Sequence, residues 1–332
     1  MLRVAFVIDP LDALNVTKDS TIAMMGAAQA RDWDVHVVYP KNLCWIQGDA
    51  YAYSQRVCLT AAFASTLEAE LIGEGELWYR AESEEFTALS AFNVIFMRKD
   101  PPFDMNYIYA TYMLDQAERD GTLVVNNAQS LRDCNEKFYT TEFAELAPPM
   151  VVSQRADKLR EFHIEHRDVV YKKLDGMGGT SIFRMREDDP NLNVVIETLT
   201  DNESIPIMAQ KFVPEIEDGD KRVLIVDGEP VPYLLARIPK KGETRGNLAA
   251  GAAGEVRPLS TRDREIAEEL GPKLVRRGLL FVGIDVIGDY LTEINVTCPT
   301  CIREIDKARE LDIAGQLMDS VHKRLRTIEA VE

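Results

Sequence analysis

The chain has 332 residues, of which 46% are hydrophobic and 28% charged, and these proportions are ordinary for a folded globular protein of two or three domains. Its formal net charge of −17 repels nucleic acid and anionic membrane surfaces, so we expect neither as a partner. No apolar run approaches the roughly 20 residues that a membrane span requires.

The first part of the chain has the pattern of an open α/β domain. Hydrophobic periodicity predicts a strand, a helix, a strand, a hairpin turn, a strand, a helix and a strand at residues 2–9, 20–31, 35–39, 48–49, 93–97, 107–119 and 122–125. No G-x-G-x-x-G motif follows the first strand, which argues against a dinucleotide site. We therefore expect an N-terminal α/β domain at residues 1–126.

The rest of the chain predicts paired strands joined by glycine-rich loops. Its strands are expected at residues 169–173, 182–185, 207–213, 221–226, 231–238, 281–286 and 290–296. Its helices are expected at residues 261–277 and 305–327, and the segment 133–137 is also expected on a helix. We expect a second part at residues 127–215, with a glycine loop, and a third at residues 216–332, with a longer loop at 239–254.

Two lysines and a glycine loop form the first candidate site. Lys172 ends an apolar strand directly before the loop that contains Gly176, Gly178 and Gly179. A buried lysine needs an anionic partner, and glycines let backbone amides approach phosphate oxygens closely. Lys137 is a second candidate cation for the same polyphosphate. The alternatives are a lysine that reaches solvent at a strand end and an ordinary tight turn.

Three oxygen donors on one predicted hairpin form the second candidate site. Asp285 lies in an apolar strand, where an unpaired carboxylate is costly, so it needs a cation. Glu293 and Asn295 are two residues apart, which in a strand points both side chains to one side. Oxygen donors without His or Cys favour Mg²⁺ or Mn²⁺. The alternative is a structural salt bridge from Asp285 to Arg222 or Lys221.

Three arginines are candidates for contact with anionic groups. Arg222 and Arg237 lie on the strands of a predicted hairpin, and Arg245 lies in the loop at 239–254. A planar guanidinium binds phosphate or carboxylate with two parallel hydrogen bonds. The loop is punctuated by glycines, so it can fold as a lid over an anionic ligand. Any one of these arginines, taken alone, is also compatible with a surface position.

The five cysteines indicate a reducing compartment. They are odd in number and lack zinc-ligand spacing, although Cys298 and Cys301 form a lone C-x-x-C. We expect reduced thiols in a cytoplasmic protein rather than a redox pair.

Seven longer motifs can be read in chain order. They are Met97-Arg-Lys-Asp-Pro-Pro-Phe-Asp104, Asn126-Asn127, Ser130-Leu-Arg-Asp-Cys-Asn-Glu-Lys137, Leu174-Asp-Gly-Met-Gly-Gly179, Gly219-Asp-Lys-Arg222, Glu243-Thr-Arg-Gly-Asn247 and Thr292-Glu-Ile-Asn-Val-Thr297. Together they resemble the prokaryotic glutathione synthetase family of the ATP-grasp superfamily, over residues 2–325. The chain departs from the family pattern at Lys173, where a proline is usual, and at Ala252 and Ala253 near the end of the lid.

The resemblance implies a fold and a reaction. The implied fold is α/β, an N-terminal open α/β domain followed by a two-lobed ATP-grasp fold. The implied reaction joins γ-glutamylcysteine to glycine and converts ATP to ADP and phosphate through an acyl phosphate, with Mg²⁺ (or Mn²⁺) and in a homotetramer. The alternatives are an ATP-grasp carboxylate-amine ligase with a different amine acceptor and a non-catalytic ATP-binding module, which the loss of a metal ligand would favour.

The resemblance also implies roles for particular residues. Those implied to bind ATP are the lysines, the loop glycines and a hinge strand that meets adenine through its backbone, namely Lys137, Lys172, Gly176, Gly178, Gly179, Gln210, Lys211, Phe212 and Val213. Those implied to hold the metal are Asp285, Glu293 and Asn295. Those implied to serve the transferred groups and the lid are Arg222, Arg237 and Arg245, and those implied to contact the substrates are Arg98 and Asn247.

Overall fold

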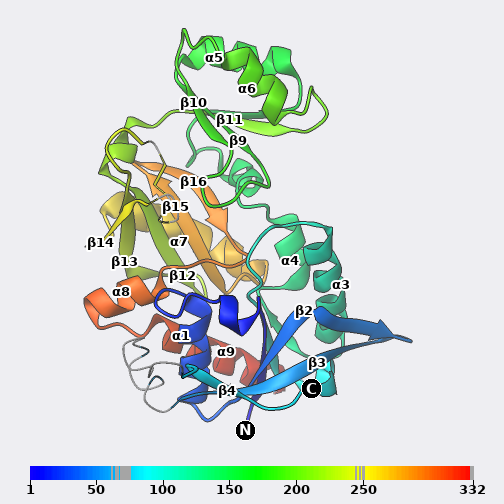
Figure 1. The fold of residues 1–332 in the computed structure, drawn as a ribbon. Coiled ribbons are helices and arrows are strands. Elements are labelled where there is room, and N and C mark those ends of the chain that lie inside the picture. The colour runs from blue at the N-terminus through cyan, green and yellow to red at the C-terminus, as the bar shows by residue number, and fades with distance from the viewer. Residues whose placement is uncertain are drawn as a thin grey trace.

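Three β-sheets organise the part of the chain that the structure describes. The computed structural model describes residues 1–60, 63, 67, 76–243, 245–246, 248 and 251–329. Figure 1 shows two of the sheets, with their helices, in a large body, while the remaining sheet, within residues 150–211, forms a smaller lobe above it. This α/β architecture agrees with the expected fold class.

The first sheet is mixed and contains the N-terminal strands. Its strands are β1 (Arg3–Val7), β2 (Asp34–Ile46), β3 (Asp49–Leu59), β4 (Tyr79–Ala81), β5 (Glu85–Ala88), β6 (Val94–Met97) and β7 (Leu123–Val125). The order is β4-β3-β2-β1-β6-β7, with β5 also paired to β3. Strands β2, β1, β6 and β7 run parallel, and β1 and β6 are nearly continuous buried apolar runs, as expected for strands covered on both faces.

Helices in this part begin at polar capping residues. Helix α1 (Ser20–Gln29) starts after Asp19, whose carboxylate accepts a hydrogen bond from the Thr21 amide, and α3 (Met105–Arg119) starts in the same way after Asp104. Helix α4 (Ala128–Asp133) follows β7 after Asn126 and Asn127. Short 3₁₀ turns lie at η1 (Leu11–Ala13), η3 (Leu89–Ala91) and η4 (Phe138–Phe143).

The smaller lobe has a hydrophobic core of its own. Its antiparallel sheet, in the order β10-β9-β11-β8, consists of β8 (Met150–Ser153), β9 (Val169–Lys173), β10 (Ile182–Met185) and β11 (Ile207–Lys211). Helices α5 (Ala156–His166) and α6 (Leu192–Leu199) cover one face. The core members run from Ala156 to Ala209, so the beginning of the range 127–215, around α4 and η4, packs with the large body.

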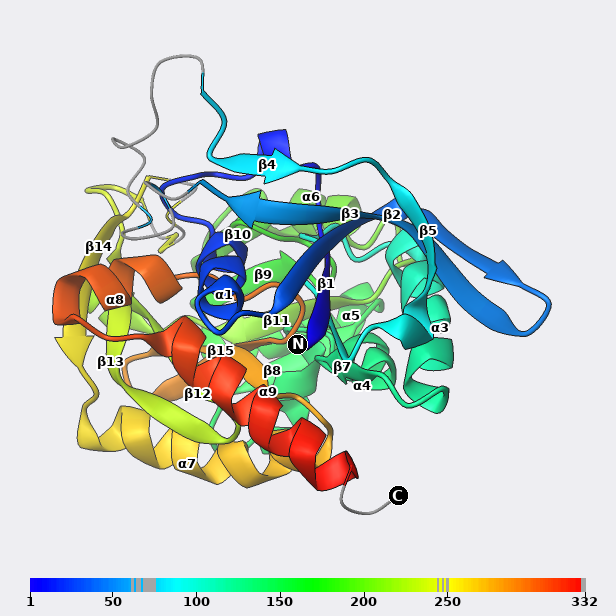
Figure 2. The ribbon, with the colours of Figure 1, turned by 90° about the horizontal axis from the view of Figure 1, so that it is seen from below.

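The third sheet lies between two layers of helices. Its order is β14-β13-β12-β15-β16, formed by β14 (Ala253–Pro258), β13 (Glu229–Ile238), β12 (Asp220–Val226), β15 (Phe281–Ile287) and β16 (Tyr290–Asn295). The turn η5 (Pro214–Asp218) leads into β12. Figure 2 shows α7 (Thr261–Arg276) on one side, with α8 (Ile302–Arg309) and α9 (Ile313–Glu329) on the other.

Alternation along β12 explains these two layers. Val223 and Ile225 enter the core that contains α7, whereas Leu224 and Val226 enter the core that contains α8 and α9. Side chains of a strand point to opposite faces in turn, so one apolar strand supplies both cores. Both cores also contain residues of the first sheet, and therefore the first and third sheets form one packed body.

Four expectations about elements need correction. The strand expected at 207–213 ends at Lys211, and the strand expected at 35–39 continues to Ile46 because it pairs with β3. The segment 134–137 follows α4 and is not helical. The C-terminal helix is two helices, because Glu310 takes a left-handed conformation (φ 51°) that ends α8.

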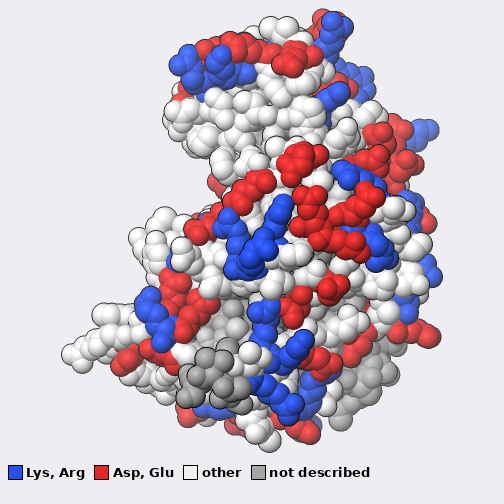
Figure 3. Space-filling view, turned by 180° about the vertical axis from the view of Figure 1, so that it is seen from behind, with Lys and Arg blue, Asp and Glu red and all other residues white. Residues whose placement is uncertain are grey.

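Figure 3 shows acidic and basic side chains interspersed over the described residues of the face seen from behind. Within the described part of the chain, no helix is both long and apolar enough to cross a membrane.

Candidate functional site

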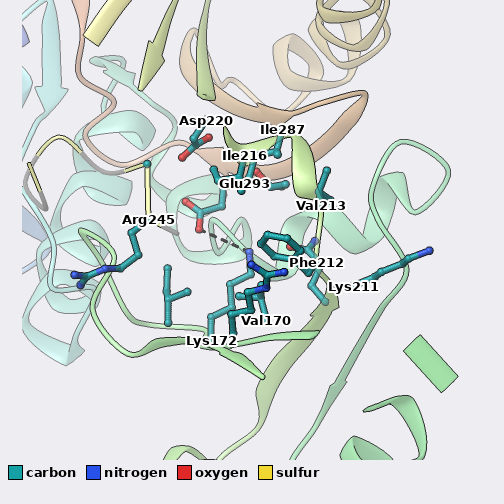
Figure 4. Close-up of a pocket in the computed structure, with 15 residues that line it drawn as sticks. Val170, Lys172, Lys211, Phe212, Val213, Ile216, Asp220, Arg245, Ile287 and Glu293 are labelled. Carbon is teal, nitrogen blue, oxygen red and sulfur yellow. Dashed lines mark ion pairs between the residues drawn. The ribbon is translucent and has the colours of Figure 1, made fainter. Parts of the chain in front are cut away.

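A cleft of about 710 Å³, open to solvent, lies between the smaller lobe and the third sheet. The predicted site residues that line it are Lys172, Gln210, Lys211, Phe212, Val213, Arg245 and Glu293. Figure 4 shows Lys172 rising from β9 toward Glu293 of the third sheet, so the cleft is walled by both lobes.

The two predicted lysines converge on one carboxylate. Glu293 Oε1 lies 3.7 Å from Lys137 Nζ and 4.0 Å from Lys172 Nζ, and both lysines are almost fully buried. Lys137 Nζ also donates to the Gly176 carbonyl oxygen at 2.6 Å and is paired with Glu136. Burial lowers the pKa of Lys172, whereas for Lys137 the charges of Glu293 and Glu136 outweigh burial and raise its pKa. The pair thus concentrates positive charge in a protein that is otherwise acidic.

The predicted hinge, Gln210 to Val213, contributes one unpaired polar group to the lining of the cleft. The side-chain amide nitrogen of Gln210 is buried and has no hydrogen-bond partner. Lys211 is exposed, and Figure 4 shows its side chain pointing away, so any contribution to the cleft comes from its backbone. The Phe212 ring lies under the guanidinium of Arg184 (3.4 Å from Cζ to the ring centroid), which Asp168 holds with two hydrogen bonds of 2.8 and 2.6 Å.

The carboxylate of Asp285 is paired with two arginines. Arg222 donates from Nε to Oδ1 at 2.5 Å and from Nη2 to Oδ2 at 2.9 Å, and Arg237 Nη2 lies 2.9 Å from Oδ2. Burial alone would raise the pKa of Asp285, but the two guanidinium groups hold it well below its usual value. The salt bridge to Arg222, the alternative from the sequence, is therefore present, while Lys221 pairs with Asp263 instead.

The three predicted metal ligands lie together. Asp285 and Glu293 are directly opposite each other on β15 and β16, which places both carboxylates on one face. Asn295 donates from its side-chain amide to Asp285 Oδ2 at 3.3 Å and leaves its own oxygen unused by this bond. Two carboxylates and one carboxamide suit Mg²⁺, which takes few protein ligands beside phosphate oxygens and water. Across the described residues, no group of three or more His, Cys, Asp or Glu side chains is placed to hold a metal.

Asp220 lines the cleft and was not anticipated as a site residue. It pairs with Arg237 through Oδ2 at 2.5 Å, while its Oδ1 is buried without a partner. Burial, assisted by the charges of Asp285 and Glu293, raises the pKa of Asp220 to about 6 despite Arg237. Its position two residues before Arg222 on β12 was the available signal, because alternation places both side chains on one face.

Glycine-loop and lid residues meet at one side of the cleft. Arg245 pairs with Glu243 at 2.7 Å and donates to the Gly179 carbonyl oxygen at 3.4 Å, so the two loops touch. Of the predicted glycines, Gly178 and Gly179 have positive φ values of 60° and 79°, a conformation that other residues rarely adopt.

The two predicted substrate residues are placed differently. Arg98 follows β6 in the large body, where it donates to Thr21 Oγ1 at 3.2 Å and to the Pro299 carbonyl oxygen at 2.9 Å. It does not line the cleft. Asn247 lies outside the described residues.

Comparison with solved structures identifies the fold. The D-cycloserine synthetase DcsG aligns with a TM-score of 0.65 at 14% identity and covers 97% of this chain and 99% of that one. The ATP-grasp ligase PsnB, in complex with a phosphomimetic variant of its minimal precursor, Mg and ADP, aligns with a TM-score of 0.62 at 16% identity and covers 97% and 98%. At these identities the likeness shows the ATP-grasp fold alone.

Sequence comparison identifies the family. The model for the N-terminal domain of prokaryotic glutathione synthetase matches residues 2–132, and the model for its ATP-grasp domain matches residues 136–310. Glutathione synthetases of Pseudomonas aeruginosa and Vibrio cholerae are 55% and 54% identical to the chain, which covers 98% and 99% of their lengths and is itself covered over 98% by each. The chain therefore belongs to the prokaryotic glutathione synthetase family and is an ADP-forming ligase of the ATP-grasp type.

Proposed function

We infer that the protein joins γ-glutamylcysteine to glycine with conversion of ATP to ADP and phosphate, which makes it an enzyme of glutathione biosynthesis. Family membership over nearly the whole chain supports this reaction. The observation that carries it is the set of cations and carboxylates below the cleft, where Lys137, Lys172 and Glu293 meet while Asp285 holds Arg222 and Arg237.

ATP would occupy the cleft between the lobes. The unpaired Gln210 amide and the backbone of Lys211 to Val213 would bind adenine, with the stacked pair Arg184 and Phe212 forming an apolar and cationic wall. Lys172 and Lys137 would bind the phosphates, and the backbone at Gly176, Gly178 and Gly179 would cover them. A buried unpaired donor is costly, so a ligand that accepts from Gln210 gains binding free energy.

The donor set of Asp285, Glu293 and Asn295 fits Mg²⁺ (or Mn²⁺). When bound, such an ion would neutralise the phosphate oxygens during transfer. In the described arrangement Asp285 is already neutralised by Arg222 and Arg237, so these ion pairs would weaken as the carboxylate engages an ion. The two guanidinium groups would then be available to the transferred phosphoryl group.

The chemistry needs positioning more than acid or base groups. The γ-phosphoryl group moves to the cysteinyl carboxylate of the dipeptide, and the glycine amine then attacks that carbonyl, loses a proton and displaces phosphate. Arg222 and Arg237 would stabilise the charge that develops in both steps, and Arg98 would bind the dipeptide. Closure of the loop at 239–254, held by Arg245, would keep water from the acyl phosphate.

An omission experiment tests the reaction. ADP release is followed with ATP, Mg²⁺, γ-glutamylcysteine and glycine, and each component is left out in turn. We expect release only with the complete set. ADP formation that is independent of glycine would contradict the ligation, and a preference for another amine would favour a different carboxylate-amine ligase of the same fold.

We also propose the cellular setting and the assembly. A reaction that consumes ATP and a thiol dipeptide suits the cytoplasm, and all five cysteines are free. We propose a homotetramer, with the exposed Tyr109 and Tyr112 of α3 as contact residues. We propose that residues 1–126 bind the dipeptide and that residues 127–215 bind the nucleotide. Residues 216–332 would hold the metal ion and supply the lid.

A further inference from the structure

Asn126 connects the first sheet to the third sheet. It directly follows β7 and is 4% exposed. Its side-chain nitrogen donates to the carbonyl oxygens of Phe281 at 2.8 Å and Val296 at 2.7 Å, and its oxygen accepts from the amides of Leu280 at 2.8 Å and Phe281 at 3.0 Å. One side chain thus holds the beginning of β15 and the residue after β16.

This carboxamide uses its full hydrogen-bonding capacity. A carboxamide has two N–H donors and an oxygen that accepts two bonds, and all four are engaged. Only one orientation fits, because the two partner carbonyls face the nitrogen and the two partner amides face the oxygen. No other residue type of this size offers the same set, since aspartate has no N–H and serine has a single hydroxyl.

The strands that Asn126 holds carry the proposed metal ligands. Asp285 lies four residues after Phe281 on β15, and Asn295 directly precedes Val296. The Phe281 backbone is bonded to Asn126, while its ring lies 5.6 Å from the guanidinium of Arg98. The proposed dipeptide arginine and the metal-binding hairpin therefore meet at the residue that Asn126 fixes.

We propose that Asn126 is a positioning residue for ligation, because it sets the placement of the β15–β16 hairpin relative to Arg98 and so aligns the dipeptide carboxylate with the nucleotide phosphate. This inference rests on the proposed function. Asn126 itself touches no substrate. The smaller lobe, which supplies Lys172, Gln210 and Phe212 to the nucleotide cleft, has a core that contains no residue of the first sheet.

Asn126→Ala tests the role, because it should change the KM for γ-glutamylcysteine and leave the Kd of Mg·ADP nearly unchanged. We expect the KM for γ-glutamylcysteine to rise about tenfold and kcat/KM to fall about a hundredfold, because misplacement by an ångström costs about that factor. The Kd of Mg·ADP, measured by calorimetry, should stay within about threefold of the wild type, since a change of that size is near 0.6 kcal/mol. Asn126→Asp, which keeps the shape but removes both donors, should shift KM in the same direction.

Asn127→Ala is the matched control. The Asn127 side chain caps α4 by accepting from the Ser130 amide at 2.9 Å and donates to Glu118 at 2.8 Å, both in the N-terminal half. We expect the Asn127→Ala variant to lower the melting temperature about as much as Asn126→Ala does. We expect it to leave the KM for γ-glutamylcysteine unchanged.

Three results would overturn the positioning role. The first is an equal KM for γ-glutamylcysteine in the Asn126 and Asn127 variants. The second is a loss of Mg·ADP affinity as large as the rise in KM. The third is unfolding of the Asn126 variants at the assay temperature, because that result would assign Asn126 to folding. The wild type in the same assay separates this claim from the proposed function: an inactive wild type refutes the ligation, whereas an active one with an unaltered KM in Asn126→Ala refutes the positioning alone.

Discussion

Glu293 forms ion pairs with lysines from two different parts of the molecule, Lys137 and Lys172. It lies opposite Asp285 on the third sheet, and it lies within 4.0 Å of Lys172 from the smaller lobe and within 3.7 Å of Lys137 from the segment after α4. Its side chain is only 18% exposed, so these attractions are little screened. A bound metal ion and polyphosphate would preserve charge balance here, with the ion beside the carboxylate and the phosphates beside the lysines.

We predict that Glu293→Gln lowers kcat by at least about a hundredfold, because even indirect partners of a metal site contribute 10–100-fold. Mn²⁺ affinity in the presence of ADP, measured by electron paramagnetic resonance, should fall as well. Glu229→Gln, an exposed substitution at the start of β13, is the control and should change neither value. Turnover near the wild-type rate in Glu293→Gln would remove Glu293 from the site.

The local sequence pattern indicated which residues belong to the site better than it indicated which side chains they contact. Lys172, Asp285 and Glu293 could be found because each is an ionisable group in an apolar strand, which burial makes costly without a partner. The stack of Arg184 on Phe212 and the unpaired oxygen of Asp220 could not, since both depend on contacts between segments far apart in sequence.

At the scale of elements, two loops meet beside the cleft. Arg245 of the lid donates to the Gly179 carbonyl oxygen of the glycine loop, and Glu243 holds its guanidinium. The lid continues into β14, which pairs with β13 from Ala253 onward, so Ala252 and Ala253 lie where the loop becomes a strand. Among the residues that the structure describes, Arg245 links the lid to the smaller lobe, and the pairing of β14 with β13 links the end of the lid to the third sheet.

We predict that Arg245→Ala leaves folding intact and raises ATP hydrolysis that is not coupled to glutathione formation. The substitution removes the guanidinium that contacts the Gly179 carbonyl oxygen, so the closed lid loses a link to the glycine loop. The measurement compares ADP with glutathione produced per turnover. Lys241→Ala, an exposed change in the same loop, serves as the control, and a ratio equal in the two variants would contradict the lid contact.

The corner between α8 and α9 predicts a pH dependence of stability. Asp306 accepts a hydrogen bond from the Ile313 amide at 3.1 Å, and burial, with the nearby charge of Asp312, raises its pKa to about 7. In the unfolded chain an aspartate titrates near about 3.9. Between these values the folded chain retains a proton that the unfolded chain has lost, so this group's contribution to stability falls as the pH rises from about 4 to about 7.

Asp306→Asn should remove that loss, because the amide oxygen still accepts from Ile313 and carries no charge. At pH 8 we expect the variant to be more stable by about 1–2 kcal/mol after allowance for partial exposure, and at pH 4 to equal the wild type. Thermal unfolding at both pH values measures the difference. A gain of the same size at pH 4 would mean that charge is not its cause.

The elements show where sequence reasoning succeeds and fails. Strands β9 and β10 have the predicted bounds because glycines mark the loop between them, and the hairpin at Asp227-Gly228 follows from a two-residue turn in which both residues have positive φ. The break at Glu310 has no glycine or proline to mark it, and beyond it α9 packs against α1, a residue pairing that local sequence does not reveal. Lys137 was placed on a helix for the same lack of a local signal.

At the scale of the whole molecule, the distribution of cores separates two bodies. The first and third sheets share two hydrophobic cores, whereas the smaller lobe has its own. The nucleotide cleft lies between these bodies, and one ion pair, from Glu293 to Lys172, crosses it. A ligand in the cleft would therefore add contacts between two bodies that have separate hydrophobic cores.

We predict that Mg·ADP at a hundred times its Kd raises the melting temperature by about 5 °C, since preferential binding to the folded state then contributes about 2.7 kcal/mol. Lys172→Met should abolish most of this rise, because the buried lysine is the smaller lobe's principal cation in the cleft. Lys173→Met is the matched control, since the next residue of β9 points to the opposite face and should keep the full rise. A full rise in Lys172→Met, measured by scanning calorimetry at the same multiple of the wild-type Kd, would show that the phosphates do not reach Lys172 and that the lobes are bridged elsewhere.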